Sequence, residues 1–203
     1  WQVAGNGDFD GDGKGDVLLR HLDGRWYQYF LDGTSVGGTA RPDLPKDLNV
    51  HLASTGDFNG DGKTDVLTRA DDGAWHLYQL NGGDVKAESS LAMKKSLDWQ
   101  VVGSGDFDGN ERDDLLMRYK NGSWLVYHFD DFSVDTPTFL ELTEDLDWKL
   151  ATIGDFDADG DTDVLLRSAA FGTWRLYKLN QNQIQSTEDV ALTPDLNWTV
   201  PQS

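Results

Sequence analysis

The sequence has 203 residues, and 38% of them are hydrophobic, which is enough to bury a sizeable core. Thirty-six acidic residues against 17 basic ones give a formal net charge of −19, which disfavours nucleic acids and anionic membrane surfaces as partners. Cysteine is absent, and no apolar run of about 18 residues predicts insertion into a membrane.

Four tandem units make up the chain. The tripeptide Gly-Asp-Phe recurs every 49 residues, at 7–9, 56–58, 105–107 and 154–156. We place the units at about 1–49, 50–98, 99–147 and 148–197 within a single repeat domain, 1–203. The segment 196–200 resembles the start of a unit, so residues 198–203 either open a fifth unit or close a ring.

Each unit contains the same predicted elements in the same order. A Trp-x-Val-like strand precedes the Gly-Asp-Phe loop, an apolar strand such as 17–20 follows it, and a turn such as Asp23-Gly24 leads to an aromatic strand such as 26–31. A weaker fourth strand is predicted at 40–44 and its copies. Four strands in 49 residues are typical of one β-propeller blade, so we expect an all-β propeller of four blades.

The aspartates of the Gly-Asp-Phe loops have the spacing of a calcium site. Positions 1, 3, 5 and 9 of each loop carry Asp or Asn, and alternate residues of a tight loop can turn their oxygens towards one hard cation. The backbone carbonyl at position 7 can complete the shell. We therefore predict up to four calcium ions, held by Asp8, Asp10, Asp12, Lys14 and Asp16; by Asp57, Asn59, Asp61, Lys63 and Asp65; by Asp106, Asp108, Asn110, Arg112 and Asp114; and by Asp155, Asp157, Asp159, Asp161 and Asp163.

The helical calcium loop is the competing motif, and it requires a bidentate Glu at position 12. That position holds Leu19, Thr68, Met117 and Leu166, inside the predicted apolar strands. The helical reading therefore fails.

The segment 7–19, Gly-Asp-Phe-Asp-Gly-Asp-Gly-Lys-Gly-Asp-Val-Leu-Leu, resembles the repeat of the FG-GAP/VCBS family. That resemblance covers nearly the whole chain and implies propeller blades with calcium in the first loop, as in integrin α-subunit heads, some fungal lectins and secreted bacterial proteins. Two loops depart from the pattern, because Glu111 and Ala158 replace glycines. We expect the third site to be the weakest, since Glu111 disfavours a positive φ.

The tryptophans and arginines also follow the repeat. They fit packing between blades or ties to neighbouring carbonyls better than they fit a ligand site, but a Trp beside an Arg can also bind a sugar ring. The candidate ligand-binding residues are Trp26, Trp75, Trp124, Trp174, Arg20, Arg69, Arg118 and Arg167.

Three functions remain open. The favoured one is a non-catalytic, carbohydrate-binding module of a larger secreted or cell-surface protein of bacterial origin, with a glycan or an extracellular protein as partner. The second is a structural or adhesive spacer. The third is a polysaccharide-cleaving enzyme, which a His, Tyr and Arg cluster breaking the repeat symmetry would favour. Four blades could form a closed ring or a fragment of a larger propeller of about seven blades.

Overall fold

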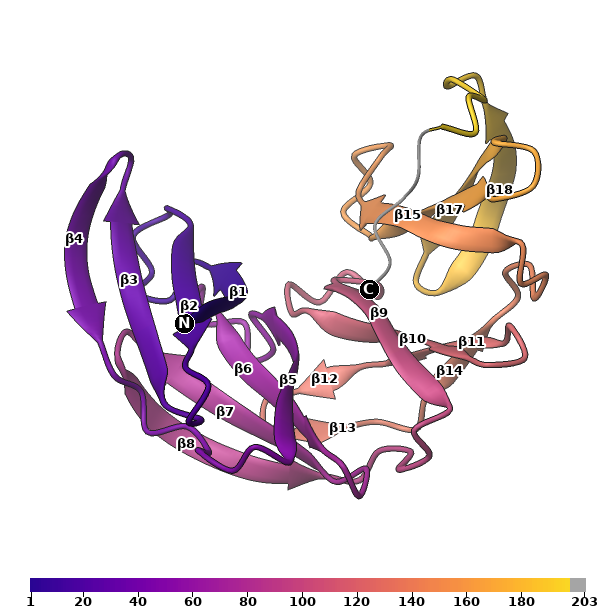
Figure 1. Ribbon diagram of the computed structural model, residues 1–203. Helices are drawn as coiled ribbons and strands as arrows, with labels where there is room; N and C mark the ends of the chain where they lie inside the picture. The colour runs from indigo at the N-terminus through magenta and orange to yellow at the C-terminus, as the bar shows by residue number, and fades with distance from the viewer. Residues whose placement is uncertain (198–203) are drawn as a thin grey trace. The chain divides into compact units, whose positions relative to one another are not determined.

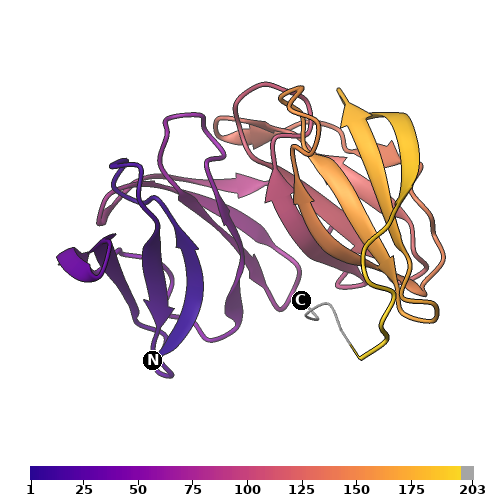
Figure 2. The ribbon, with the colours of Figure 1, turned by 90° about the horizontal axis from the view of Figure 1, so that it is seen from above.

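The computed structural model describes residues 1–197 and contains four separate four-stranded antiparallel sheets (Figures 1 and 2). We call them blades 1 to 4. No helix lies among residues 1–197, and so none there could cross a membrane. The predicted all-β fold of four-stranded blades is confirmed. The strands of blade 1 are β1 (Gln2–Gly7), β2 (Asp16–Arg20), β3 (Trp26–Asp32) and β4 (Ser35–Ala40); those of blade 2 are β5 (Val50–Gly56), β6 (Asp65–Ala70), β7 (Trp75–Asn81) and β8 (Asp84–Leu91).

Blade 3 is the irregular one. Its order is β14-β11-β10-β9, and a separate two-stranded hairpin follows β11. Pro137 has no backbone N–H to donate, and strand pairing resumes only at the residue after it. The strands of blade 3 are β9 (Trp99–Gly105), β10 (Asp114–Tyr119), β11 (Trp124–Tyr127) and β14 (Thr138–Leu140); those of the hairpin are β12 (Phe129–Asp130) and β13 (Ser133–Val134); those of blade 4 are β15 (Trp148–Gly154), β16 (Asp163–Ser168), β17 (Trp174–Asn180) and β18 (Gln183–Val190).

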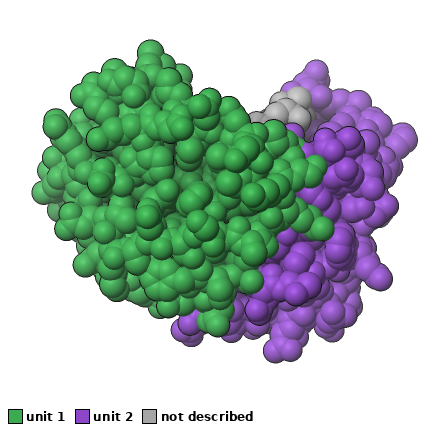
Figure 3. Space-filling model, turned by 90° about the horizontal axis from the view of Figure 1, so that it is seen from below, with its two compact units in different colours: residues 1–97, 129–134 green, residues 98–128, 135–203 purple. Residues whose placement is uncertain are grey.

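The chain forms two compact units, coloured separately in Figure 3. Unit 1 is Trp1–Leu97 with Phe129–Val134, and it contains blades 1 and 2 and the hairpin. Unit 2 is Asp98–His128 with Asp135–Ser203, and it contains blades 3 and 4. The predicted strand start at Trp198 and the segment 198–203 lie outside the described residues. Ring closure and the single-domain assignment stay predictions.

In blade 1 the fourth strand lies earlier than predicted, whereas in blade 3 β14 lies inside the predicted copy of that strand. In blade 1 it is β4, which ends at Ala40, and not the segment 40–44. Leu44, at the end of the predicted segment, is 2% exposed although it lies outside the strand. Its side chain instead enters the core of unit 1 from an irregular segment after β4.

The turn between the second and third strands requires glycine. Gly24, Gly73, Gly122 and Gly172 all have positive φ. A Cβ atom added at these four positions would lie 1.9, 2.0, 1.8 and 2.0 Å from a backbone carbonyl oxygen of the segment after the fourth strand. The predicted turns at Asp23-Gly24, Asp72-Gly73 and Asn121-Gly122 are therefore confirmed, and they place that segment against the turn.

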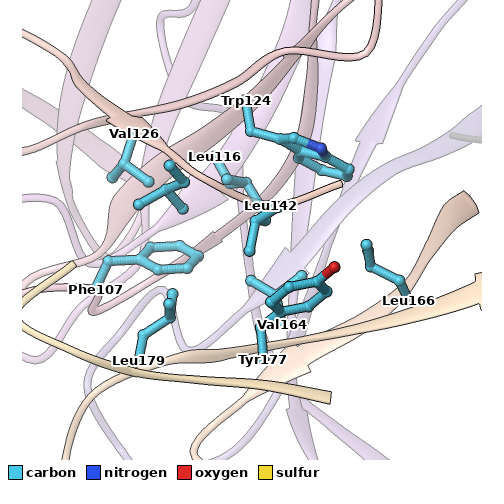
Figure 4. Close-up of a cluster of buried hydrophobic side chains, with 10 residues drawn as sticks. Phe107, Leu116, Trp124, Val126, Leu142, Val164, Leu166, Tyr177 and Leu179 are labelled. Atoms are coloured by element: carbon cyan, nitrogen blue, oxygen red, sulfur yellow. The ribbon is translucent and has the colours of Figure 1, made fainter. Parts of the chain in front are cut away.

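Neighbouring blades within each unit share a core. In unit 1, Phe9, Leu18 and Trp26 of blade 1 pack with Val66 and Tyr78 of blade 2. In unit 2, Phe107 and Leu116 of blade 3 lie with Val164 and Tyr177 of blade 4 in the same arrangement (Figure 4). Each blade thus has two faces. The following face carries the loop Phe, and the preceding face carries the Tyr of the third strand. Within each unit, the following face of the first blade packs on the preceding face of the second blade.

Candidate metal centres

The aspartate at loop position 1 fixes the shape of each Gly-Asp-Phe loop. In blade 1, Asp8 Oδ1 accepts hydrogen bonds from the backbone N–H groups of Gly11 (2.7 Å) and Asp12 (3.1 Å), and its Oδ2 accepts one from Gly13 (2.7 Å). The aspartates at position 1 of the other loops, Asp57, Asp106 and Asp155, make the same three bonds. The four loops therefore have one common conformation.

That conformation needs positive φ at positions 4 and 6. Gly11 and Gly13 have φ of 79° and 81°, and the non-glycine residues Ala158 and Glu111 have φ of 63° and 64° at the corresponding positions. A side chain in this region is strained. The structure thus bears out the expectation that Glu111 is held at positive φ, while the affinity of the third loop stays a prediction.

The aspartate at position 9 is the buried member of each loop. Asp16 is 2% exposed, and Asp65, Asp114 and Asp163 are each 0% exposed. Asp16 Oδ2 accepts a hydrogen bond from Phe9 N (2.9 Å), and its Oδ1 accepts one from Leu31 N (2.9 Å) at the end of β3. This carboxylate ties the loop to the third strand and places a negative charge at the bottom of the loop.

The carboxylates of the loops converge. Asp8, Asp10 and Asp16 have oxygens within 4.8 Å of one another, and so do Asp155, Asp157 and Asp163. Burial, together with the charge of neighbouring aspartates, raises the pKa of Asp10 and Asp163. The structure thus brings these six predicted ligands together in two groups of three, whereas the predicted ligand Asp12 pairs with Lys14 Nζ at 2.8 Å.

Blade 2 has the most unusual carboxylate. Asp65 Oδ2 is buried and has no hydrogen-bond partner within residues 1–197. Burial, with the charges of Asp61 and Asp57, raises the pKa of Asp65 to about 8. A buried carboxylate is costly unless a cation compensates it. The all-oxygen donor set with an orphaned buried oxygen fits a hard cation such as Ca²⁺.

Two side chains near the loops were missed from the sequence. His128 is 12% exposed, and its Nδ1 lies 2.9 Å from Asp114 Oδ2 and 3.6 Å from Asp108 Oδ2 in blade 3. Burial lowers the pKa of His128, but the bond to Asp114 and the nearby carboxylates outweigh it and raise that pKa overall. Lys178 Nζ lies 3.9 Å from Asp157 Oδ2 in blade 4. Both residues stand four places after the recurring Trp, where blades 1 and 2 have Phe30 and Gln79, and this comparison was the available signal.

Neighbouring loops are joined within each unit. Thr64 of blade 2 donates its backbone N–H to the carbonyl oxygen of Asp8 in blade 1 (2.7 Å), and Thr162 of blade 4 does the same to Asp106 of blade 3 (2.6 Å). Each donor directly precedes the buried position-9 aspartate of its own loop. A backbone hydrogen bond therefore links the two Gly-Asp-Phe loops of each unit.

The recurring tryptophans and arginines hold the blades together. Trp26, Trp75 and Trp124 are at most 3% exposed, and their indole Nε1 groups donate to the carbonyl oxygens of Pro45, Lys94 and Thr143. Trp174 makes the equivalent bond to Thr193. Three of these rings are buried and Trp174 is half-buried, which fits the favoured packing interpretation, while their ligand role stays a prediction.

Each arginine lies over the Trp of its blade. Arg20 Cζ is 4.7 Å from the centre of the Trp26 ring, and the pairs Arg69–Trp75, Arg118–Trp124 and Arg167–Trp174 are alike. The guanidinium groups donate to backbone carbonyls of the segment before the next repeat, those of Asp47, Ser96, Asp145 and Asp195. These contacts fit the favoured interpretation of the arginines as structural ties, and their ligand role stays a prediction.

The fold and the loops define the class of protein: a β-propeller whose blades each carry an aspartate-rich Gly-Asp-Phe loop. A family model described as FG-GAP-like repeat matches residues 8–68 and 57–117, which together span more than half of the chain. The chain belongs to the FG-GAP-like repeat family. No curated protein matches it. Repeats of this family suggest a binding or adhesion module and are typically non-catalytic.

Proposed function

We propose that the chain is a calcium-stabilised, non-catalytic extracellular module that binds carbohydrate, within a larger secreted or cell-surface bacterial protein. The observation that carries the calcium part is the buried carboxylate at position 9 of every loop, which in blades 1 and 4 lies beside two further converging carboxylate oxygens. A buried carboxylate is costly unless a cation compensates it, and among residues 1–197 a histidine lies against the position-9 carboxylate in blade 3.

Calcium would stabilise the fold substantially. Sites of extracellular modules have dissociation constants of about 10⁻⁴ to 10⁻³ M, so a tenfold excess of free calcium adds about 1.4 kcal/mol for each site. Four sites would add roughly 6 kcal/mol, a large share of the stability of a typical domain. Under this proposal calcium is structural and the ligand binds elsewhere.

Carbohydrate is favoured over protein as the ligand by an aromatic pocket on blade 1. A cavity of about 650 Å³ is lined by Trp1, Tyr27 and Tyr29 together with basic side chains. Aromatic walls with a few polar groups are typical of small-ligand sites. His21 lies beside this pocket, with its ring centre 4.8 Å from that of Trp1, next to Tyr27 and Arg25. A His, Tyr and Arg grouping of the kind that would favour a polysaccharide-cleaving enzyme therefore stands at its edge, and the enzyme remains the third candidate.

The calcium part is tested by comparing thermal unfolding with calcium and with chelator. Asp10→Ala removes a loop ligand, and Asp84→Ala, an exposed carboxylate on β8, is the matched control. We expect calcium to raise the melting temperature of the wild-type chain and of Asp84→Ala more than that of Asp10→Ala. Equal shifts in all three proteins would contradict a site in the first loop.

The binding part is tested by a glycan-array screen in calcium. Saturable binding to one class of glycan is expected. A large thermal shift without any glycan binding would instead support the alternative, a structural or adhesive propeller that contacts other proteins.

A further inference from the structure

The pocket on the preceding face of blade 1 has a composition that no other blade shares. It lies beside β3 and the segment after β4, entirely within unit 1. Its aromatic wall consists of Trp1, which is 54% exposed, and Tyr27, with ring centres 5.9 Å apart. Tyr29 continues this wall at 5.1 Å from Tyr27. A planar ligand ring can stack against such a wall.

The polar lining of the pocket is positively charged. Arg41 Cζ lies 5.5 Å from the centre of the Tyr27 ring, and Arg41 and Lys46 make no ion pair or hydrogen bond through their side chains within residues 1–197. Arg25 differs, because Asp23 Oδ2 lies 2.8 Å from its Nη2 and neutralises it. Two unpaired cations beside the exposed Trp1 and the half-buried Tyr27 are unusual on a chain with a net charge of −19. They suit a ligand that carries a negative charge.

The repeat shows that this composition is particular to blade 1. The position of Tyr27 is held by His76, Leu125 and Arg175 in the other blades. Arg41 directly follows Ala40, the strand partner of Gln28, and the residues at its place in the other blades are Ser90, Phe139 and Asp189. No other blade places a guanidinium group over a tyrosine ring at this point, so blade packing does not require the pair.

Tyr27 and Arg41 would also stay accessible if another blade packed on the preceding face of blade 1. Blade 2 has such a neighbour, because blade 1 covers its preceding face. In blade 2 the counterpart of Tyr29 is Tyr78, which is 6% exposed. The counterpart of Tyr27 is the half-buried His76, and the counterpart of Arg41 is the exposed Ser90. A further blade would therefore cover Tyr29 and leave the outer part of the pocket open.

We propose that this pocket binds an acidic saccharide, with a sugar ring against Trp1 and Tyr27 and its carboxylate or sulfate group on Arg41 and Lys46. Asp43, also in the lining, can accept hydrogen bonds from sugar hydroxyl groups. This inference rests on the proposed carbohydrate-binding function and names the class of ligand and its site.

Isothermal titration calorimetry at a fixed calcium concentration tests the proposal. The probes are a glucuronate-containing tetrasaccharide, the same tetrasaccharide with its carboxyl groups reduced to alcohols, and an O-sulfated neutral tetrasaccharide. The variants are Arg41→Gln and Tyr27→Ala, and the control is Lys86→Gln, which removes one exposed positive charge from β8. Thermal unfolding in calcium confirms that each variant is folded.

We expect the wild-type chain to bind at least one charged probe. Carboxyl reduction of the probe, Arg41→Gln and Tyr27→Ala should each weaken binding at least about tenfold, and Lys86→Gln should leave the affinity unchanged. The carboxylated and sulfated probes identify which anionic group is preferred. Wild-type affinity in Arg41→Gln, or equally tight binding of the reduced probe, would overturn this site while leaving carbohydrate binding by the module intact. Absence of binding to any saccharide would overturn both proposals. A chain that is dimeric by analytical ultracentrifugation and becomes monomeric in both variants would make the pocket an interface between copies and overturn the ligand.

Discussion

The loop phenylalanines give a sharp test of blade packing, because two of them differ in burial but not in repeat position. Phe107 is 0% exposed, whereas Phe156 in the next loop is 47% exposed. Each donates its backbone N–H to the position-9 aspartate of its own loop, at 3.1 and 2.9 Å. Substitution by alanine keeps these bonds, so the two variants differ in packing alone.

The magnitudes follow from the burial. Phe107→Ala opens a cavity among Leu116, Val164 and Leu179 and should cost about 3–5 kcal/mol. Phe156→Ala removes a half-exposed ring and should cost about 1 kcal/mol. Both residues belong to unit 2, so the two values refer to the same unfolding transition.

Urea denaturation in calcium, followed by tryptophan fluorescence, measures the difference. The two variants should differ by about 2 kcal/mol or more, which corresponds to melting temperatures at least about 8 °C apart for a unit of this size. Equal losses in the two variants would refute the argument that the loop phenylalanine stabilises its blade by packing on the next one.

Three further predictions concern the loops and the core. Glu111→Gly should stabilise the calcium-free protein by about 1 kcal/mol in urea denaturation, because glycine relieves the strain of positive φ; a loss of stability would contradict this. In calcium-free buffer, the free energy of unfolding should fall as pH rises from about 4 to about 8, because folded Asp65, with a pKa of about 8, holds a proton that the unfolded chain has released. Excess calcium should abolish this fall. A free energy of unfolding that does not change with pH in calcium-free buffer would refute the prediction. Trp75→Phe should cost about 1 kcal/mol or more through the lost bond to Lys94, and no loss would show that this bond contributes nothing.

The features that recur at a fixed spacing could be predicted from the sequence. The loop oxygens, the Gly-containing turns and the first three strands occupy the same positions in every repeat, so each copy strengthens the prediction made for the others. The structure places Asp8, Asp10 and Asp16 together, as their alternation in a tight loop indicates. The packing role of the tryptophans was also the favoured reading of their recurrence.

Features that break the repeat could not be predicted in the same way. The fourth strand of blade 1 was misplaced because Leu44 is an apolar residue of an irregular segment that still enters the core, and an apolar residue type alone does not distinguish it from a strand residue. The hairpin β12–β13 repeats the outer strand pairs of the other blades, such as Leu31 with Val36 in blade 1, but in blade 3 it is separated from the four-stranded sheet. Its Phe129 contacts Phe58 of blade 2 at 4.5 Å between ring centres, a contact between residues far apart in the sequence.

The site residues missed from the sequence share this cause. His128 and Lys178 reach the loops from the third-strand side of the sheet, and different residues occupy their position in each blade. The Tyr27–Arg41 pair depends on strand register across the hairpin between β3 and β4, including a register shift near Leu31. Spacing in the sequence does not reveal such register.

Calorimetric titration of the chelator-treated chain with calcium tests the central claim most directly. We expect saturable binding of up to four ions, the weakest being the one in the loop of Glu111, with a rise in melting temperature over the same calcium concentrations. No bound calcium at millimolar concentrations, with an unchanged melting temperature, would contradict the assignment of these loops as calcium sites.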